Sequence, residues 1–152
     1  MADGLMKIKS LFFDRAGVIK KVDVATRRVL SRFGAFVRTT AKHSIRKKKG
    51  PSQPGSPPHS HVGLLKKFIF FGYEPTAKNV VIGPTLLSRK KSGSSTVPQV
   101  LEYGGRTERA FWDDTERKRK SKKVTIQSRP FMHPAMDKEL PKLPAMWRDS
   151  VK

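Results

Sequence analysis

The feature that most constrains this chain is a helical repeat of apolar residues that begins after Asp14 and continues to about Lys48. At about 100° per residue, one face of such a helix is apolar, and its centre is formed by Val18, Val22, Ala25, Val29, Phe33 and Phe36. Further apolar residues widen this face, namely Ile19, Leu30 and Val37. The opposite face carries mainly cations: Arg27, Arg28, Arg32, Arg38 and Lys42. The repeat therefore predicts an amphipathic helix with a buried apolar face and a basic back.

Two residues inside the repeat leave its continuity open. Asp14 is suited to cap the first turn, and Asp23 could cap a second segment after a short break. Gly34 costs about 1 kcal/mol relative to alanine inside a helix, so we expect either a kink or the close approach of another element there. The alternatives are one long helix or two helices that abut.

Shorter elements are expected after this helix, because aromatic and β-branched stretches alternate with turn residues. In chain order, we expect an antiparallel hairpin formed by Leu64–Tyr73 and Asn79–Ile82, a helical turn over Val97–Tyr103 ended by Gly104, a basic hairpin over residues 107–127, and a helix over Pro134–Leu140 ended by Pro141.

Two stretches lack an apolar repeat and predict loops. Residues 50–61 contain four prolines, which favour an extended loop or an arm that reaches a neighbouring molecule. Residues 88–96 are rich in Ser and Gly and predict a second loop. The chain is thus expected to be a single α+β domain over residues 1–152, in which a small antiparallel or mixed β-sheet packs against the long N-terminal helix and a short C-terminal helix.

Charge is the part of the composition that bears on function. The chain has 33 Lys and Arg against 12 Asp and Glu, which gives a formal net charge of +21. Such a chain repels itself unless a negative partner neutralises it, and nucleic acid or an acidic protein surface would serve. The cations are densest in two runs, Arg46, Lys47, Lys48 and Lys49, and then Arg117, Lys118, Arg119, Lys120, Lys122 and Lys123.

Neither basic run identifies a partner by itself. The second run is typical of a nucleic-acid patch or a nuclear-import tag, and equally of a solvated hairpin limb. The first run lies at a helix C-terminus, where positive charge complements the helix dipole. Neither run is interleaved with aromatic residues, which argues against base stacking and sequence-specific readout of single strands.

Residues that could support catalysis or metal binding do not cluster in the sequence. The four histidines are His43, His59, His61 and His133, and the pair at 59 and 61 offers half of a metal site without a cysteine or a clear third ligand. We therefore expect no enzymatic activity, no metal and no cofactor. No apolar run approaches the roughly 18 residues of a membrane span or resembles a signal peptide, so we expect neither a membrane partner nor export.

Three spaced segments carry a family resemblance. The first follows Pro58 and includes Gly63, Leu65 and Lys66; the second is Val100-Leu101-Glu102-Tyr103-Gly104; the third is Pro130-Phe131-Met132-His133-Pro134-Ala135. In this order they resemble the neck proteins of long-tailed bacteriophages, a family described as head-tail joining, tail-completion or minor tail proteins. Two positions depart from the family pattern, since Val62 and Gly105 stand where threonine is usual.

The resemblance implies a structural virion protein, assembled in the bacterial host cytoplasm, that catalyses no reaction. Members form rings, hexameric at the top of the tail or dodecameric nearer the portal, through which the genome passes. Such a ring joins the head to the tail and completes or terminates the tail tube. Its implied partners are a head-side connector, adaptor or stopper ring, the tail tube or tail terminator protein, and genomic DNA in the channel.

The resemblance also implies which residues define the fold or the interfaces: Gly63, Leu65, Glu102, Tyr103, Gly104, Pro130, Phe131 and Pro134. The side chains of Leu65, Tyr103 and Phe131 are expected to pack in the core. Glu102 is expected either to accept backbone N–H bonds or to pair with an arginine of the same or an adjacent subunit. The two basic runs are expected to face DNA or acidic neck partners.

A second class of function stays open from the residues alone, namely a basic nucleic-acid-binding domain of the ribosomal or chromatin-associated type. Such a domain should remain monomeric and bind DNA or RNA with a steep salt dependence. A neck protein should instead form rings or require partner rings.

Overall fold

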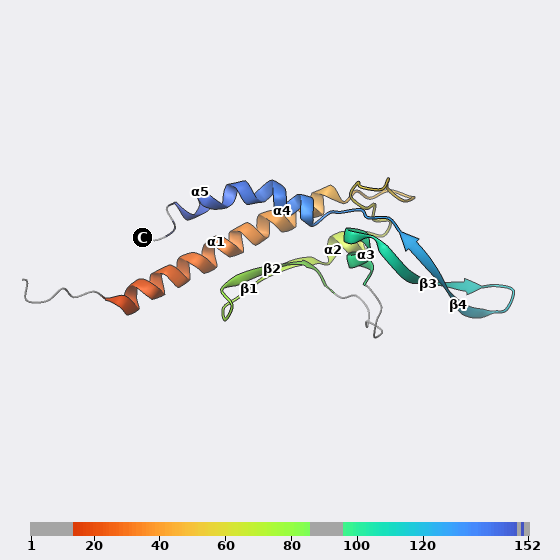
Figure 1. Cartoon of the computed structure of the whole chain (residues 1–152), viewed down its shortest axis with the longest axis horizontal. Helices are drawn as coiled ribbons and strands as arrows, with labels where there is room; N and C mark the ends of the chain where they lie inside the picture. The colour runs from red at the N-terminus through yellow and green to blue at the C-terminus, as the bar shows by residue number, and fades with distance from the viewer. Residues whose placement is uncertain (1–13, 86–95, 149, 151–152) are drawn as a thin grey trace, which may run out of the picture.

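The protein is described by a computed structural model over residues 14–85, 96–148 and 150 (Figure 1). Its elements in chain order are α1 (Arg15–Ser44), α2 (Leu64–Lys67), β1 (Ile69–Glu74), β2 (Asn79–Pro84), α3 (Val97–Tyr103), β3 (Gly105–Asp113), β4 (Lys118–Ile126), α4 (His133–Glu139), the 3₁₀ turn η1 (Leu140–Lys142) and α5 (Leu143–Trp147). The predicted α+β class is confirmed. The loop expected at residues 88–96 lies outside the described residues except for Thr96.

Helix α1 is one continuous helix, so the alternative of two abutting helices is wrong. The Asp14 side chain caps it by accepting a hydrogen bond from the Gly17 N–H at 2.9 Å. Asp23 caps nothing within the helix and instead pairs with Lys78 at 2.6 Å. Asp14 is therefore the residue that caps the first turn of α1, as the sequence predicted.

Gly34 allows another element to approach α1 closely and introduces no break. A Cβ added at this position would lie 2.8 Å from Val80 Cγ2 and 2.9 Å from the Phe71 ring, distances at which neighbouring atoms must move. The missing side chain therefore lets the β1–β2 hairpin rest directly on the helix.

The core forms around the second half of α1, which lies between two layers (Figure 1). The β1–β2 hairpin covers one side of the helix, and α4, η1 and α5 cover the other. The buried cluster consists of Phe33, Val37, Ala41, Ile45, Ile69, Phe131 and Ala135. All three layers contribute to this cluster, so their packing is mutually dependent.

The strands form two separate antiparallel hairpins, not one sheet. In the first hairpin, Phe71 lies opposite Ile82 and Tyr73 opposite Val80. The second hairpin pairs β3 with β4 over nine positions. It projects beyond the C-terminal end of α1 (Figure 1). This projecting hairpin lies in the region where the sequence placed a basic hairpin.

Two boundaries differ from the sequence-based expectation. Leu64–Lys67 is a helical turn and not part of a strand, because Gly63 has φ 86° and its carbonyl accepts a hydrogen bond from the Lys67 N–H at 2.9 Å. Pro141 does not end the C-terminal helical run; it lies in the first turn of η1, where a missing N–H is tolerated, and α5 follows.

The first half of α1 leaves its apolar residues exposed, which contradicts the expectation that the whole face is buried. The exposed fractions of Val18, Ile19, Val22 and Val24 range from 43% to 51%, whereas Val29 is 3% exposed. The physical reason is length, since α1 extends past the ends of both covering layers (Figure 1). Phe36, also predicted to be buried, is 37% exposed and lies under Arg32.

The proline-rich stretch 50–61 folds back onto its own chain. The Gly55 N–H donates to the Ser128 carbonyl at 2.9 Å, and the Ser60 N–H donates to the Arg46 carbonyl at 2.9 Å. Ser52 and Ser60 are buried. The sequence left open whether this stretch is a loop or an arm that reaches a neighbouring molecule. Within this single chain it forms a loop.

A buried carboxylate links the C-terminal layer to α1. Glu139 is 3% exposed and accepts hydrogen bonds from the Lys142 ammonium at 2.7 Å and the Thr40 hydroxyl at 2.8 Å. The Lys142 ammonium, with the Thr40 hydroxyl, holds the pKa of the Glu139 carboxyl below its ordinary value. Because the folded state favours the charged form, this carboxylate stabilises the fold above the ordinary pKa, and the stabilisation is lost as the pH falls below it.

We predict that Gly34→Leu lowers the free energy of unfolding by about 1–3 kcal/mol, because the new side chain must push β1–β2 off the helix. Chemical denaturation followed by circular dichroism measures this. The control is Thr39→Leu on the exposed face of the same helix, expected to change stability by about 0.5 kcal/mol or less. Equal effects of the two substitutions would contradict the close packing at Gly34.

We predict that Glu139→Gln is less stable than the wild type by about 1–3 kcal/mol at pH 7. The difference should shrink as the pH falls below 4.5, the ordinary pKa, because the wild-type carboxyl then becomes protonated too. Denaturation curves between pH 7 and pH 3 test this, with the exposed Asp137→Asn as control. A difference that stays constant over this range would show that the charge of Glu139 is not what stabilises the fold.

Candidate functional site

The Glu102 carboxylate, on the last turn of α3, links two parts of the described chain that are distant in sequence. It is 9% exposed and accepts three backbone N–H bonds, from Phe131 at 3.0 Å, Met132 at 3.0 Å and His133 at 2.8 Å. These N–H groups lie at the start of α4, where backbone N–H groups have no acceptor within the helix. Glu102 was expected either to accept backbone N–H bonds or to pair with an arginine. Within the described chain it accepts backbone N–H bonds.

Two of the three segments singled out in the sequence meet at this carboxylate, since Glu102 belongs to the second segment and residues 131–133 belong to the third. Leu65 and Leu101 pack against the core cluster that contains Phe131. Gly104 ends α3 with φ 76°, and a Cβ added there would lie 3.1 Å from the Ser128 N. We call this assembly of Leu65, Leu101, Glu102, Gly104 and residues 130–133 the Glu102 junction.

Arg129 ties the proline-rich loop to the Glu102 junction. Its backbone N–H donates to the Leu101 carbonyl at 2.6 Å, and its guanidinium Nε donates to the Ser52 carbonyl at 3.0 Å. The sequence analysis did not single out Arg129, since a lone arginine before Pro130 carries no pattern. The junction therefore joins four chain segments that are distant in sequence.

Tyr103 does not pack in the core, contrary to expectation. Its exposed fraction is 78%, whereas that of its neighbour Glu102 is 9%. Val100 and Glu102 are the buried residues of the seven-residue helix α3, whereas Tyr103, its last residue, lies outside the core. Among the expected anchors, Tyr103 is thus available only for contacts outside the subunit core. Pro134 lies in the first turn of α4, where proline is favoured.

The β3–β4 hairpin displays the second basic run on both of its faces. Successive side chains of a strand point to opposite faces of the hairpin. Lys118, Lys120 and Lys122 of β4 therefore lie on one face, and Arg119 and Lys123 lie on the other. Lys118 and Lys120 pair with Glu116, and Lys120 also pairs with Asp113 at 2.6 Å. Among the described residues, Arg119, Lys122 and Lys123 form no ion pair, so these three carry the unneutralised charge of β4.

The first basic run, Arg46, Lys47, Lys48 and Lys49, follows the end of α1 after Ile45 and is exposed. Its backbone is held by a bridge between Arg46 and His59 of the proline-rich loop. Within the described residues, no hydrogen bond or ion pair joins this run to the hairpin run. Each run is a separate solvent-exposed surface.

A third cationic cluster surrounds Phe70 on the outer face of β1, and sequence reasoning did not identify it. Arg38 and Lys42 of α1 each lie 5.8 Å from the ring centroid, and the ring is 46% exposed. Burial, together with the charges of Arg38 and Lys66, lowers the pKa of the Lys42 ammonium. The signal available in the sequence was the spacing of Arg38 and Lys42, one helical turn apart.

Two of the histidines lie beside oxygen atoms of the described chain. His59 faces the Gly50 carbonyl at 3.3 Å, and His133 lies 3.6 Å from Asp137. Within the described ranges, no three His, Asp or Glu side chains lie close enough to hold a metal ion. No described helix is long and apolar enough to cross a membrane.

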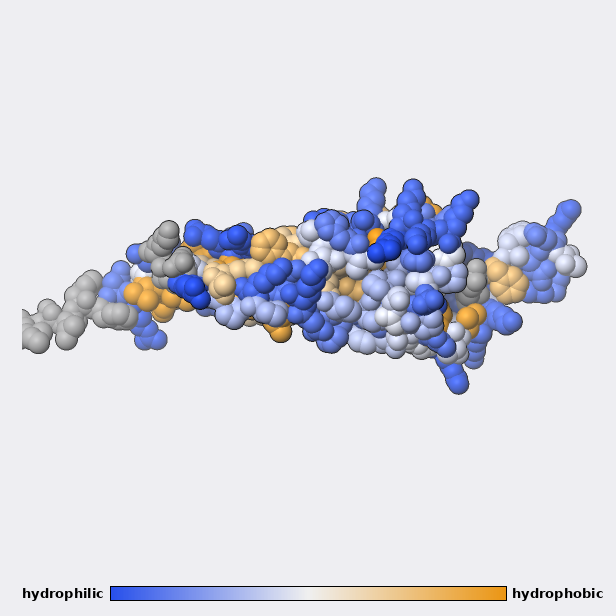
Figure 2. All heavy atoms as spheres, turned by 90° about the horizontal axis from the view of Figure 1, so that it is seen from above, coloured by the Kyte–Doolittle hydropathy of each residue, from blue (hydrophilic) through white to orange (hydrophobic). Residues whose placement is uncertain are grey.

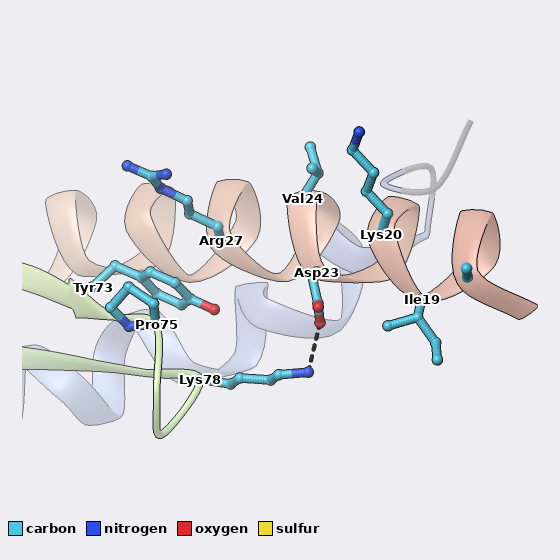
Figure 3. A pocket seen from close by; sticks show the side chains of 9 residues that line it. Ile19, Lys20, Asp23, Val24, Arg27, Tyr73, Pro75 and Lys78 are labelled. Atoms are coloured by element: carbon cyan, nitrogen blue, oxygen red, sulfur yellow. Dashed lines mark hydrogen bonds and ion pairs between the residues drawn. The ribbon is translucent and has the colours of Figure 1, made fainter.

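A groove of about 590 Å³ lies between the first half of α1 and the turn of β1–β2 (Figure 3). Its walls combine apolar and cationic side chains: Ile19, Val24, Tyr73 and Pro75, with Lys20, Arg27 and Lys78. Figure 2 shows apolar residues among hydrophilic ones along the molecule, including the start of α1 and the projecting hairpin. The exposed large apolar side chains lie on many elements, among them Val18 in α1, Val81 in β2, Val97 in α3 and Trp147 in α5.

Comparison with known proteins returned no matching family model, curated protein or solved structure. The resemblance to phage neck proteins therefore stays a prediction from the residues of the three segments.

We predict that Glu102→Ala lowers the free energy of unfolding by about 2–4 kcal/mol, because it leaves buried N–H groups of the α4 turn without an acceptor. Denaturant titration followed by circular dichroism measures this. The control is Glu108→Ala on the projecting hairpin, which removes an exposed carboxylate and should change stability by about 0.5 kcal/mol or less. If the two variants are equally stable, Glu102 does not hold the junction.

Proposed function

We propose that this protein is a structural subunit of a tailed-phage neck, which forms a ring that joins the head to the tail and completes or terminates the tail tube. The observation that carries the proposal is the Glu102 junction. Glu102 of the second segment binds the start of the third through three backbone N–H bonds, and Leu65 of the first segment packs on the core cluster that contains Phe131. This arrangement supports the proposal because each of the three segments has a structural role in the same core.

The exposed surfaces of the subunit also support assembly. The start of α1 leaves Val18 and Val22 each 43% exposed, and the projecting hairpin leaves Trp112 61% exposed. Exposed large apolar residues occur on other elements too, and contiguous patches of such residues are typical of interaction sites. A subunit of this kind is completed by its neighbours.

In the proposed ring the protein acts passively, by holding partners and leaving a channel for the genome. A hexamer is the form we propose first, with a dodecamer as the alternative copy number. The proposed partners are a head-side connector or stopper ring and the tail tube or its terminator, and the proposed location is the virion neck. No chemical step is assigned to the subunit.

The charge sets a condition on this assembly. Six copies would bring together 6 × 21 = 126 formal positive charges, whose repulsion must be relieved by acidic neighbouring rings, by DNA in the channel or by bound anions. The unpaired cations of β4 and the exposed run after α1 are the residues proposed to face these anions. Assembly should therefore depend on salt.

The alternative is a basic nucleic-acid-binding domain, and the cations around Phe70 are the observation that favours it. Lys42, Arg38 and Lys66 repel one another, and a phosphate group would relieve that repulsion. An exposed aromatic ring beside phosphate-binding cations also suits single-stranded nucleic acid. The two functions differ in oligomeric state, which makes them separable by experiment.

We predict that the purified protein forms one discrete multiple of its 17.2 kDa mass, with a fraction assembled that changes between low and high salt. Light scattering coupled to size exclusion measures the mass. Val22→Asp should reduce the assembled fraction because it places a charge on the uncovered face of α1, whereas Val62→Asp, in an exposed loop, should not.

A strict monomer at every salt concentration would count against self-assembly of the free chain. A DNA-binding titration would then separate the two functions. A salt slope of several units in a log-log plot would favour the nucleic-acid-binding domain.

A further inference from the structure

The outer face of the β1–β2 hairpin leaves an aromatic ring uncovered. Phe70 in β1 is 46% exposed, and two glycines border it on this face. Gly83 of β2 lies directly opposite Phe70, and Gly72 follows two positions along β1, so both share its face of the hairpin. A Cβ added at either glycine would have no atom from another part of the described chain within 4 Å. The surface beside the ring is therefore open.

The backbone does not require glycine at these two positions. Neither Gly72 nor Gly83 has a positive φ, and β1 pairs with β2 in one continuous register without a bulge. Glycine weakens a strand, and where no bulge explains it, it is typical of a place that a ligand or another backbone approaches closely. The described chain puts no backbone of its own there. The two glycines therefore indicate a ligand from outside the chain.

Cations line the edge of this open face. The Arg38 guanidinium and the Lys42 ammonium of α1 each lie 5.8 Å from the Phe70 ring centroid. The Arg38 Nε donates to the Ile69 carbonyl at 2.9 Å, which holds the guanidinium at β1. Among the described residues, Arg38, Lys42 and Lys66 form no ion pair. Burial, with the charges of Arg38 and Lys66, lowers the pKa of the Lys42 ammonium, so an anion placed among these cations would relieve their repulsion.

We infer that this face binds single-stranded nucleic acid. An unpaired base lies against Phe70 and above the two glycines, and the neighbouring phosphates lie at Arg38, Lys42 and Lys66. Contact between a base and an aromatic ring, together with neutralised phosphates, is the combination by which proteins hold single strands. The inference goes beyond the proposed function, since a ring that joins head and tail needs no site for an unpaired base.

The shape and charge of the face favour this ligand over two others. Duplex nucleic acid exposes only the edges of its bases in the grooves, so it would reach the cations and leave the ring and the glycines without a partner. An acidic protein segment would neutralise the cations, but it has no planar group to cover the open surface. Glu74, at the far end of β1, lies about 13 Å from Phe70 along the strand and would repel phosphate, so the strand is held near α2 (Figure 1).

Filling the open surface tests the inference without removing a ring or a charge. Gly72→Val and Gly83→Val place a residue favoured in strands where no atom stands in the way, so both proteins should fold at least as stably as the wild type. Binding is measured by fluorescence anisotropy of a labelled oligothymidylate of about 12 nucleotides in about 0.3 M NaCl, which suppresses general attraction to a basic chain.

Each valine should weaken binding of this single strand about fivefold or more, and should leave binding of a duplex of the same length within about twofold of the wild type. The control is Asn79→Val, an exposed position at the far end of the same hairpin, which should change neither affinity. Phe70→Leu should act like the valines, whereas Phe36→Leu, at another half-exposed ring beneath an arginine, should not.

The phosphate contacts have a separate readout. The double substitution Lys42→Gln with Lys66→Gln should reduce the slope of a log-log plot of single-strand affinity against salt by about 1.4, since each phosphate contact contributes about 0.7. The matched control, Lys21→Gln with Lys138→Gln, removes two exposed lysines elsewhere and should leave the slope unchanged.

Three outcomes would overturn the inference. Gly83→Val and Phe70→Leu could bind the single strand as tightly as the wild type does. They could weaken single strand and duplex equally, which would show that the face binds phosphate without a base. They could weaken binding of polyglutamate more than binding of the single strand, which would assign the face to an acidic protein. Each of these outcomes leaves the proposed ring standing, because light scattering measures assembly separately.

Discussion

The fold depends on a carboxylate at the end of a seven-residue helix that satisfies three backbone N–H groups far along the chain. Glu102 fixes where α4 begins, and the start of α4 places Phe131 and Ala135 against α1. The same turn anchors the base of the β3–β4 hairpin and, through Arg129, the proline-rich loop. Without this carboxylate, buried N–H groups would lack partners and the C-terminal layer would lose its position on the core.

The subunit has a small core and more apolar surface than that core can cover. Only the second half of α1 is enclosed by both layers, so the first half extends into solvent with its branched residues exposed. Net positive charge opposes the close approach of two such chains. The proposed ring would therefore need partners that supply negative charge, while the exposed apolar residues would supply contact surface.

The sequence predicted those parts of the fold whose signal is local. Asp14 predicted the start of α1, because a capping residue acts within one helical turn. Stretches of aromatic and β-branched residues that alternate with turn residues predicted both hairpins, because this pattern also extends over only a few residues. The exposure of Val18 and Tyr103 was not predictable, because periodicity shows which face is apolar and not whether anything covers it. For Glu102, the sequence left two kinds of partner open, backbone N–H groups or an arginine. The fold shows that the carboxylate binds the N–H groups of residues 131–133. The groove beside α1 had no sequence signal, since it joins residues more than 40 positions apart.

Ring formation is the central claim, and electron microscopy of the purified protein, negatively stained at low and high salt, tests it most directly. The account predicts closed rings with one rotational symmetry and a central opening, whose number changes with salt. Isolated particles of a single chain under all conditions, or open filaments without closure, would contradict it.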